Sequence, residues 1–345
     1  YKGLGPQGGT TSDLVAAIEK AVEDGVDVIN YSIGGGAGDP WVGADDVAFL
    51  AAFDAGVFVA TSAGNEGPDV STIGSPANAP WVMSVAASYA NRVFMSTIKL
   101  RAGDASLTVA GTSIGHGTSR LTLVDAAGVP DINGNSDGTC LAPFPPGTFQ
   151  PNTVVLCKSG RGFSANFVNA GGASAVIFSS ATIPYDYALG LPPVTAVQVL
   201  NPVLRQIRQL MADQPGQAVQ VTIETGEPVK APSPQVPVDT VVGFSSRGPA
   251  LNGVTGRPIS VIKPDITGPG IQILAGYSPE TTNSIAYGGV DQPGQLFAVI
   301  QGTSMSSPHL AGAGALLKAL HPTWTPAQMR SALMTTALDA WIRAH

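Results

Sequence analysis

The sequence predicts an α/β protein whose parallel β-sheet is covered by helices on both faces, with a mostly-β domain inserted into it. In the first 90 residues, short apolar runs alternate with segments of helical periodicity, as in strand–helix–strand crossovers. From about residue 98 the pattern changes to short β-branched runs separated by Gly, Pro and Asn, and the helical pattern returns after residue 300. A chain of 345 residues suits one large globular domain or one domain carrying a smaller insert, and the change of pattern favours the insert.

The first region contains two predicted helices and three predicted strands. Ser12 is placed to cap a helix whose apolar positions run from Leu14 to Val22, and Gly25 is placed to end it. A second helix is predicted over 45–55, followed by Gly56. We expect strands over 26–33, 57–61 and 81–87. Strands joined by helices of this length pair in parallel, so they form one sheet.

The insert is expected to occupy residues 118–232, which leaves residues 1–117 and 233–345 for the α/β domain. Strand-like runs inside it cover 121–124, 153–156, 175–178 and 219–223. Residues 228–237, with four prolines, predict a stiff connector at its far end. After the connector we expect strands over 241–244 and 299–300, and helices over 304–320 and 326–334.

Composition and charge exclude several classes of protein. The chain carries 17 Lys and Arg against 24 Asp and Glu and has no basic run, so we expect no nucleic-acid partner. The longest apolar stretches, such as 310–317, are far shorter than the roughly 20 residues that span a bilayer, so we expect no membrane partner. Two cysteines cannot build a disulfide scaffold or a structural zinc site, and no Asp-rich loop suggests calcium. We therefore predict no metal and no cofactor.

The most specific motif is Gly302-Thr303-Ser304-Met305, between a predicted strand and a long predicted helix. Ser304 would lie at the positive end of the helix dipole, with its own amide directed toward the space where a tetrahedral oxyanion would form. A serine that only caps the helix would show the same local pattern. Other segments decide between these two interpretations.

Two further segments leave the predicted sheet at its carboxyl edge, where α/β proteins place their sites. Asn65, within residues 63–68, can donate its side-chain amide to an anion, although Asn-x-Gly is also common in turns. Residues 30–36 continue a strand into a glycine run with accessible backbone groups. A peptide can pair with such a segment as an added strand.

Together these three segments, in this order, resemble the subtilisin-like serine proteases. The resemblance implies a subtilisin-like fold, Ser304 as the nucleophile, and an oxyanion hole formed by the Asn65 side chain and the Ser304 amide. It also implies that polypeptide substrates lie against Ser32, Ile33, Gly34, Ser62, Ala63 and Gly64.

The insert resembles the protease-associated domain of the larger secreted subtilases, through Cys140 and residues 154–157 and 170–173. Residues 244–249 and 263–270 resemble the segments that follow this domain in those proteins. Cys140 and Cys157 enclose a short loop and are candidates for a disulfide in an oxidising compartment; two free buried thiols are the alternative. The resemblance favours secretion, and it suggests that the insert limits substrate access or holds a second copy of the chain.

A serine hydroxyl needs a base, and the family supplies a histidine oriented by an aspartate, both earlier in the chain than Asn65. No histidine precedes His116, whose Gly-His-Gly-Thr setting copies the family motif but follows Asn65. We expect His309 to be a buried, structural residue. We also expect His321 and His345 to be solvated.

Two explanations of the missing base remain. Either an upstream segment of the same protein carries the Asp and the His, or the protein is a noncatalytic peptide-binding or adhesion relative. Retention of Ser304 and Asn65 favours the first explanation, because a binding protein has no chemical use for an oxyanion hole. We therefore predict a secreted serine endopeptidase whose 345 residues alone are inactive.

Overall fold

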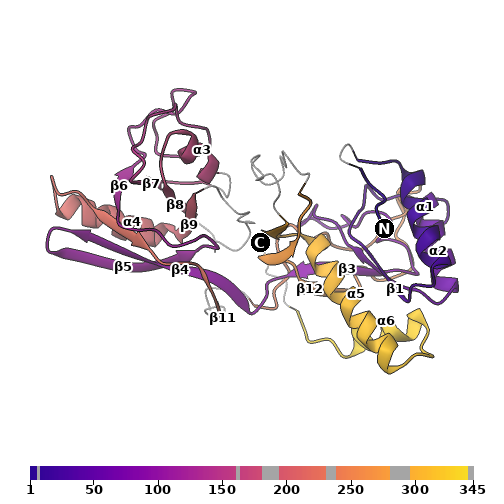
Figure 1. The fold of residues 1–345 in the computed structure, drawn as a ribbon. Helices are drawn as coiled ribbons and strands as arrows, with labels where there is room; N and C mark the ends of the chain where they lie inside the picture. The colour runs from indigo at the N-terminus through magenta and orange to yellow at the C-terminus, as the bar shows by residue number, and fades with distance from the viewer. Residues whose placement is uncertain (6–7, 161–163, 181–193, 231–237, 280–295, 341–345) are drawn as a thin grey trace. The chain divides into compact units, whose positions relative to one another are not determined.

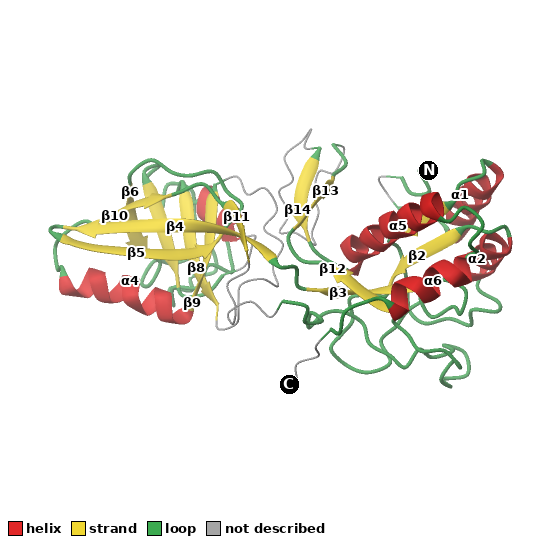
Figure 2. Cartoon of the chain, turned by 90° about the horizontal axis from the view of Figure 1, so that it is seen from below, coloured by secondary structure: helices red, strands yellow, loops and turns green. Residues whose placement is uncertain are grey.

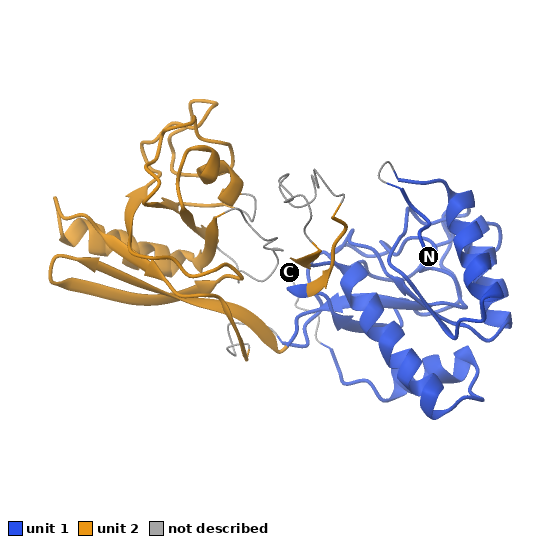
Figure 3. Ribbon diagram, viewed as in Figure 1, with its two compact units in different colours: residues 1–90, 237–273, 301–345 blue, residues 91–236, 274–300 orange. Residues whose placement is uncertain are grey.

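The computed structural model describes residues 1–5, 8–160, 164–180, 194–230, 238–279 and 296–340. The chain divides into two compact units, coloured separately in Figure 3. Unit 1 comprises Tyr1–Ala90, Pro237–Ile273 and Gln301–His345, and unit 2 comprises Asn91–Val236 and Leu274–Ile300.

Unit 1 is built on a parallel sheet with the strand order β1-β2-β3-β12 (Figure 1). Its strands are β1 (Val28–Tyr31), β2 (Phe58–Ser62), β3 (Met83–Ser88) and β12 (Ile266–Pro269). All three pairings are parallel, so the four carboxyl ends share one edge of the sheet. Among the described strands, β1 pairs only with β2, which makes β1 an edge strand.

Four helices cover the two faces of this sheet (Figure 2). They are α1 (Thr11–Glu23), α2 (Ala44–Asp54), α5 (Thr303–Leu320) and α6 (Pro326–Thr335). Val59 of β2 packs with Ile18 of α1 and Phe49 of α2, whereas the neighbouring Phe58 packs with Leu310 of α5. Alternate residues of a strand point to opposite faces, so β2 is buried along its whole length. The predicted parallel sheet with helices on both faces is confirmed.

Two local expectations in unit 1 were wrong. The N-cap of α1 is Thr10, which forms a capping box with Asp13; Ser12 lies inside the helix, because the box requires a partner three residues after the cap. The predicted strand over 241–244 is absent from the described residues. Val241 instead makes an isolated bridge with Ser88, because the chain turns immediately afterwards.

Unit 2 contains a mixed sheet with the order β10-β6-β7-β8-β9-β5-β4-β11, in which β10 also pairs with β4. This extra pairing closes seven of the strands into a ring. The strands are β4 (Arg92–Ala102), β5 (Ala105–Thr112), β6 (Leu121–Asp125), β7 (Thr153–Cys157), β8 (Ala175–Ser180), β9 (Thr195–Leu200), β10 (Gln220–Ile223) and β11 (Glu227–Lys230). The neighbours β6, β7, β8 and β9 run parallel, and α3 (Ser164–Ala170) connects β7 to β8. Helix α4 (Asn201–Asp213) follows β9.

The division into units differs from the predicted boundaries at 117/118 and 232/233. Strands β4 and β5 belong to unit 2, because Ile98 and Leu100 pack in one apolar cluster with Val154, Ile177 and other residues of the parallel strands. Residues 274–300 also belong to unit 2. A separate two-stranded sheet pairs β13 (Ile273–Gly276) with β14 (Phe297–Ile300). The predicted connector over 228–237 lies largely outside the described residues.

A second apolar cluster of unit 2 contains a disulfide between Cys140 and Cys157, both fully buried. The bridge joins the end of β7 to the loop that precedes it, which is the pairing considered from the sequence. None of the helices in the described part of the chain has both the length and the apolar character needed to cross a bilayer.

Candidate active site

Ser304 is the second residue of α5, which begins directly after a sharp turn. The N-cap residue, Gly302, has a φ of 144°, a conformation that only glycine adopts readily. Its amide donates to the Gly270 carbonyl at 2.9 Å, which ties the turn to the segment after β12. The first four amides of a helix have no acceptor within the helix, so the Ser304 amide is directed away from α5 at its positive end.

The Asn65 side chain lies against the same turn. Its Oδ1 accepts hydrogen bonds from the Thr303 amide at 2.9 Å and from Thr303 Oγ1 at 3.0 Å. Because an amide donor fixes the identity of the acceptor, the Asn65 oxygen faces Thr303 and its NH₂ group is left to donate elsewhere. Asn65 is exposed. Two donors, the Asn65 NH₂ group and the Ser304 amide, therefore flank one turn.

The carboxyl end of β1 is joined to the serine by reciprocal hydrogen bonds. Ser32 Oγ donates to the Ser304 carbonyl at 2.8 Å, and Ser304 Oγ donates to the Ser32 carbonyl at 3.3 Å. The backbone then continues through Ile33 and Gly34, and Gly35 donates to the Ser75 carbonyl at 3.0 Å. The predicted nucleophile and the predicted substrate strand thus lie side by side.

The second predicted substrate segment follows β2 and is more buried than the first. The Ala63 side chain is inaccessible and packs in a small apolar cluster with Ile73 and Ala250. Ser62 is 7% exposed. Gly64 has a φ of 110°, and its amide donates to Thr303 Oγ1 at 3.3 Å. The Ala63 side chain therefore cannot reach a ligand, and the amide and carbonyl of Gly64 are both bonded within the protein, to Thr303 and to Ser246.

Two residues at this site, Thr303 and Asn30, make contacts that the sequence did not predict. Thr303 links Gly64 and Asn65 to the start of α5, as described above. Asn30 Oδ1 accepts from Ser307 Oγ at 2.8 Å, and Asn30 Nδ2 donates to Ser32 Oγ at 3.1 Å. Both residues belong to the motifs quoted from the sequence, but their spacing alone gives no sign of these partners.

One carboxyl group and one phenol near the substrate strand, those of Asp46 and Tyr31, carry raised pKa values. Asp46, in the first turn of α2, is 1% exposed; burial raises its pKa to about 7, and the charges of Asp45 and Asp39 add to this effect. Burial, followed by the charges of Asp45 and Asp46, also raises the pKa of Tyr31 above its ordinary value. Tyr31 directly precedes Ser32, so these groups lie beside the substrate strand.

Within the part of the chain that the structure describes, no histidine hydrogen-bonds to Ser304. His309 is exposed, not buried as predicted, because Pro308 and His309 lie on the outer face of α5; its Nδ1 lies 2.7 Å from the Met305 carbonyl oxygen. His116 belongs to unit 2.

The remaining histidines and acidic side chains form no further site in the described ranges. His321 is exposed and stacks on Trp324, with ring centroids 4.0 Å apart, and His345 lies outside the described residues. No group of three or more His, Cys, Asp or Glu side chains in the described ranges is arranged to hold a metal ion.

A sequence profile of the subtilase family matches residues 1–343. The chain belongs to the subtilase family. Two relatives from Arabidopsis thaliana are subtilisin-like protease SBT2.4, 34% identical over 98% of this chain, and SBT5.4, 34% identical over 94% of it. This subtilase chain spans 44% and 41% of their respective lengths.

A solved structure, the psychrophilic subtilisin-like protease Apa1 from the Antarctic psychrotroph Pseudoalteromonas sp. AS-11, is 18% identical to the chain. The alignment covers 97% of this subtilase chain and 70% of that protein, with a TM-score of 0.40.

Proposed function

We propose that the complete protein is a serine endopeptidase that cleaves peptide bonds through an acyl-enzyme on Ser304. Ser304 Oγ attacks the peptide carbonyl carbon, the C–N bond breaks as the amine leaves with a proton, and water then hydrolyses the ester. The observation that carries this proposal is the pair of donors at one turn, the Asn65 NH₂ group and the Ser304 amide, because acyl transfer needs donors where negative charge develops on the carbonyl oxygen.

The substrate strand supports an extended peptide as the ligand. Residues 32–34 leave β1 next to Ser304, and Gly34 and Gly35 carry no side chain that would obstruct a paired backbone. A peptide lying along this segment would place one of its carbonyl groups near Ser304 Oγ. Main-chain hydrogen bonds would supply affinity, as in other cases of strand addition.

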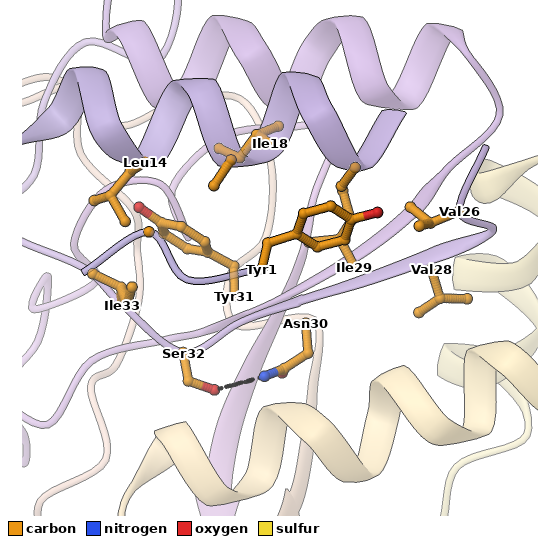
Figure 4. A pocket seen from close by; sticks show the side chains of 13 residues that line it. Tyr1, Leu14, Ile18, Val26, Val28, Ile29, Asn30, Tyr31, Ser32 and Ile33 are labelled. Atoms are coloured by element: carbon orange, nitrogen blue, oxygen red, sulfur yellow. Dashed lines mark hydrogen bonds between the residues drawn. The ribbon is translucent and has the colours of Figure 1, made fainter. Parts of the chain in front are cut away.

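We further propose that a segment preceding Tyr1 in the complete protein supplies the general base and the aspartate that orients it. The open edge of β1 supports this arrangement: it borders a pocket lined by consecutive residues 28–33 and by Leu14 and Ile18 of α1 (Figure 4). Consecutive residues alternate between the faces of a strand, so the pocket follows the edge itself, where another strand can pair.

We propose that unit 2 is a protease-associated domain and that the protein is secreted. The buried disulfide supports an oxidising compartment. Unit 2 would restrict large substrates or hold a second copy of the chain. Light scattering of the complete protein tests the second copy, and comparing kcat/KM for a tripeptide anilide and for casein tests the restriction.

A fluorophosphonate probe tests the central proposal, because it labels only an activated serine. The complete protein should be labelled and should cleave peptides, and Ser304→Ala should abolish both. Asn65→Ala should lower kcat about 100- to 1000-fold, the loss known for the equivalent donor in a subtilisin. A complete protein that binds peptide but leaves Ser304 unlabelled would instead be a noncatalytic peptide-binding relative.

The 345 residues alone should show no measurable proteolysis, since Ser304 has no described base. Robust cleavage by this chain that Ser304→Ala abolishes would contradict this expectation, and His116→Ala would then be the first variant to test.

A further inference from the structure

The segment Phe244–Pro249 has no part in the reaction proposed above, yet it contacts the loop that carries Asn65. Ser246 hydrogen-bonds to both residues that flank Asn65. Its amide donates to the Gly64 carbonyl at 3.0 Å, and its Oγ accepts from the Glu66 amide at 3.2 Å. Ser246 Oγ also donates to Glu66 Oε2 at 2.9 Å.

The packing around these hydrogen bonds leaves little freedom. Ser246 is fully buried, so water cannot replace its hydroxyl. A Cβ atom at Gly64 would lie 2.6 Å from Ser246 Oγ, and one at Gly67 would overlap the Ser245 carbonyl oxygen. The Gly67 amide donates to the Phe244 carbonyl at 2.8 Å. The loop from Gly64 to Gly67 is therefore in close contact with this segment on both sides of Asn65.

We propose that Ser246 is a positioning residue for the oxyanion hole; this inference rests on the proposed function. Thr303 fixes the side-chain oxygen of Asn65, and Ser246 fixes the backbone before and after it. An oxyanion donor acts only when it is about 2.7–3.1 Å from the developing negative charge. Asn65 itself is exposed on a loop, so its NH₂ group depends on these neighbours for its position. Because Ser246 is fully buried, it acts through Asn65 and not by contact with a ligand.

A matched pair of variants in the complete protein separates positioning from general stability. Ser245 is also fully buried, and its Oγ accepts from the Ala87 amide at 3.0 Å at the end of β3, away from the flanks of Asn65. Both Ser246→Ala and Ser245→Ala should lower the thermal midpoint. With a tripeptide anilide, Ser246→Ala should lower kcat about tenfold with little change in KM, whereas Ser245→Ala should leave kcat within about twofold.

A double-mutant cycle with Asn65→Ala provides the decisive measurement. If Ser246 acts through Asn65, then Ser246→Ala should lower kcat less than about twofold when Asn65 is already alanine. An equal loss with and without Asn65, or a loss no larger than that of Ser245→Ala, would overturn the inference. If Ser246→Ala does not fold, Ser246→Cys, which keeps a weak acceptor, takes its place in the same cycle.

The same experiments distinguish this inference from the proposed function. If Ser304→Ala and Asn65→Ala behave as proposed while the cycle is additive, only the role of Ser246 is overturned. If Ser304→Ala keeps full activity, the proposed function fails whatever the cycle gives.

Discussion

The substitution Asp265→Asn removes a buried carboxylate that holds two cations in unit 1. Asp265 Oδ2 lies 2.8 Å from Lys263 Nζ, and its Oδ1 lies 2.6 Å from an Arg330 nitrogen. The Lys263 and Asp265 side chains are fully inaccessible, and the other described partner of Lys263 Nζ is the Val82 carbonyl at 2.6 Å. The variant therefore leaves a lysine ammonium buried without its counterion.

Removing one partner of a buried ion pair costs about 3–5 kcal/mol of unfolding free energy. We expect the lower end, about 3 kcal/mol, because Lys263 can lose its proton. Burial lowers its pKa to about 8, although Asp265 partly offsets this effect. At pH 7, neutralising a group with that pKa costs only about 1.4 kcal/mol.

The pH dependence gives a second signature. The unfolded lysine has a pKa of about 10.4, so between about pH 8 and 10 the unfolded state binds more protons and the Lys263 contribution to stability rises with pH. It is lost as the pH falls through about 8. Without Asp265 the pKa of folded-state Lys263 should fall further. In the variant, the rise of stability with pH should therefore begin below pH 8.

Urea unfolding followed by tryptophan fluorescence measures this effect, because the described tryptophans, Trp41, Trp81 and Trp324, all lie in unit 1. Asp24→Asn is the matched control: Asp24 lies 2.7 Å from Lys20, but both side chains are largely exposed. Solvent screens such a pair, so this variant should change stability far less. A loss below about 1 kcal/mol in Asp265→Asn, or equal losses in the two variants, would refute the reasoning.

Three further perturbations test other features of the fold. Gly314→Ala should destabilise unit 1 by about 1–3 kcal/mol, because the added Cβ would lie 2.6 Å from a ring carbon of Phe58 in β2. Gly312→Ala, at an exposed position of the same helix, should stabilise unit 1 by up to about 1 kcal/mol, so urea unfolding should show changes of opposite sign in the free energy of unfolding of the two variants. Because the pKa of Asp46 is raised to about 7, its contribution to stability is complete below about pH 4 and is lost as the pH rises through 7. The free energy of unfolding should therefore fall by roughly 1.4 kcal/mol per pH unit in that window, and Asp46→Asn should remove this fall. Replacing Cys140 and Cys157 by serine should cost unit 2 about 3 kcal/mol, since the bridge spans a sequence separation of 17; differential scanning calorimetry measures this loss, and an unchanged transition would contradict it.

Local sequence patterns were sufficient for most elements of unit 1 and for several strands of unit 2. The helix Thr303–Leu320 and the strand Phe58–Ser62 were each predicted to within one residue at either end, because helical and strand periodicities are local properties. Helix α4 was not predicted, although Leu204, Ile207 and Leu210 form a buried stripe whose spacing is a local helical signal. The Thr10 capping box is likewise a local signal, because Thr10 and Asp13 are three residues apart.

The sequence by itself determined which residue types this protein offers for chemistry, through motifs that matched its family. Only the tertiary structure decided which residues meet: Ser32 contacts Ser304 across 272 positions, and Ser246 contacts Glu66 across 180. It also placed β4 and β5 in unit 2 and left His309 exposed. The physical reason is that sheet order and helix packing set these contacts, and both depend on how distant apolar faces are buried together, which no short stretch of sequence specifies.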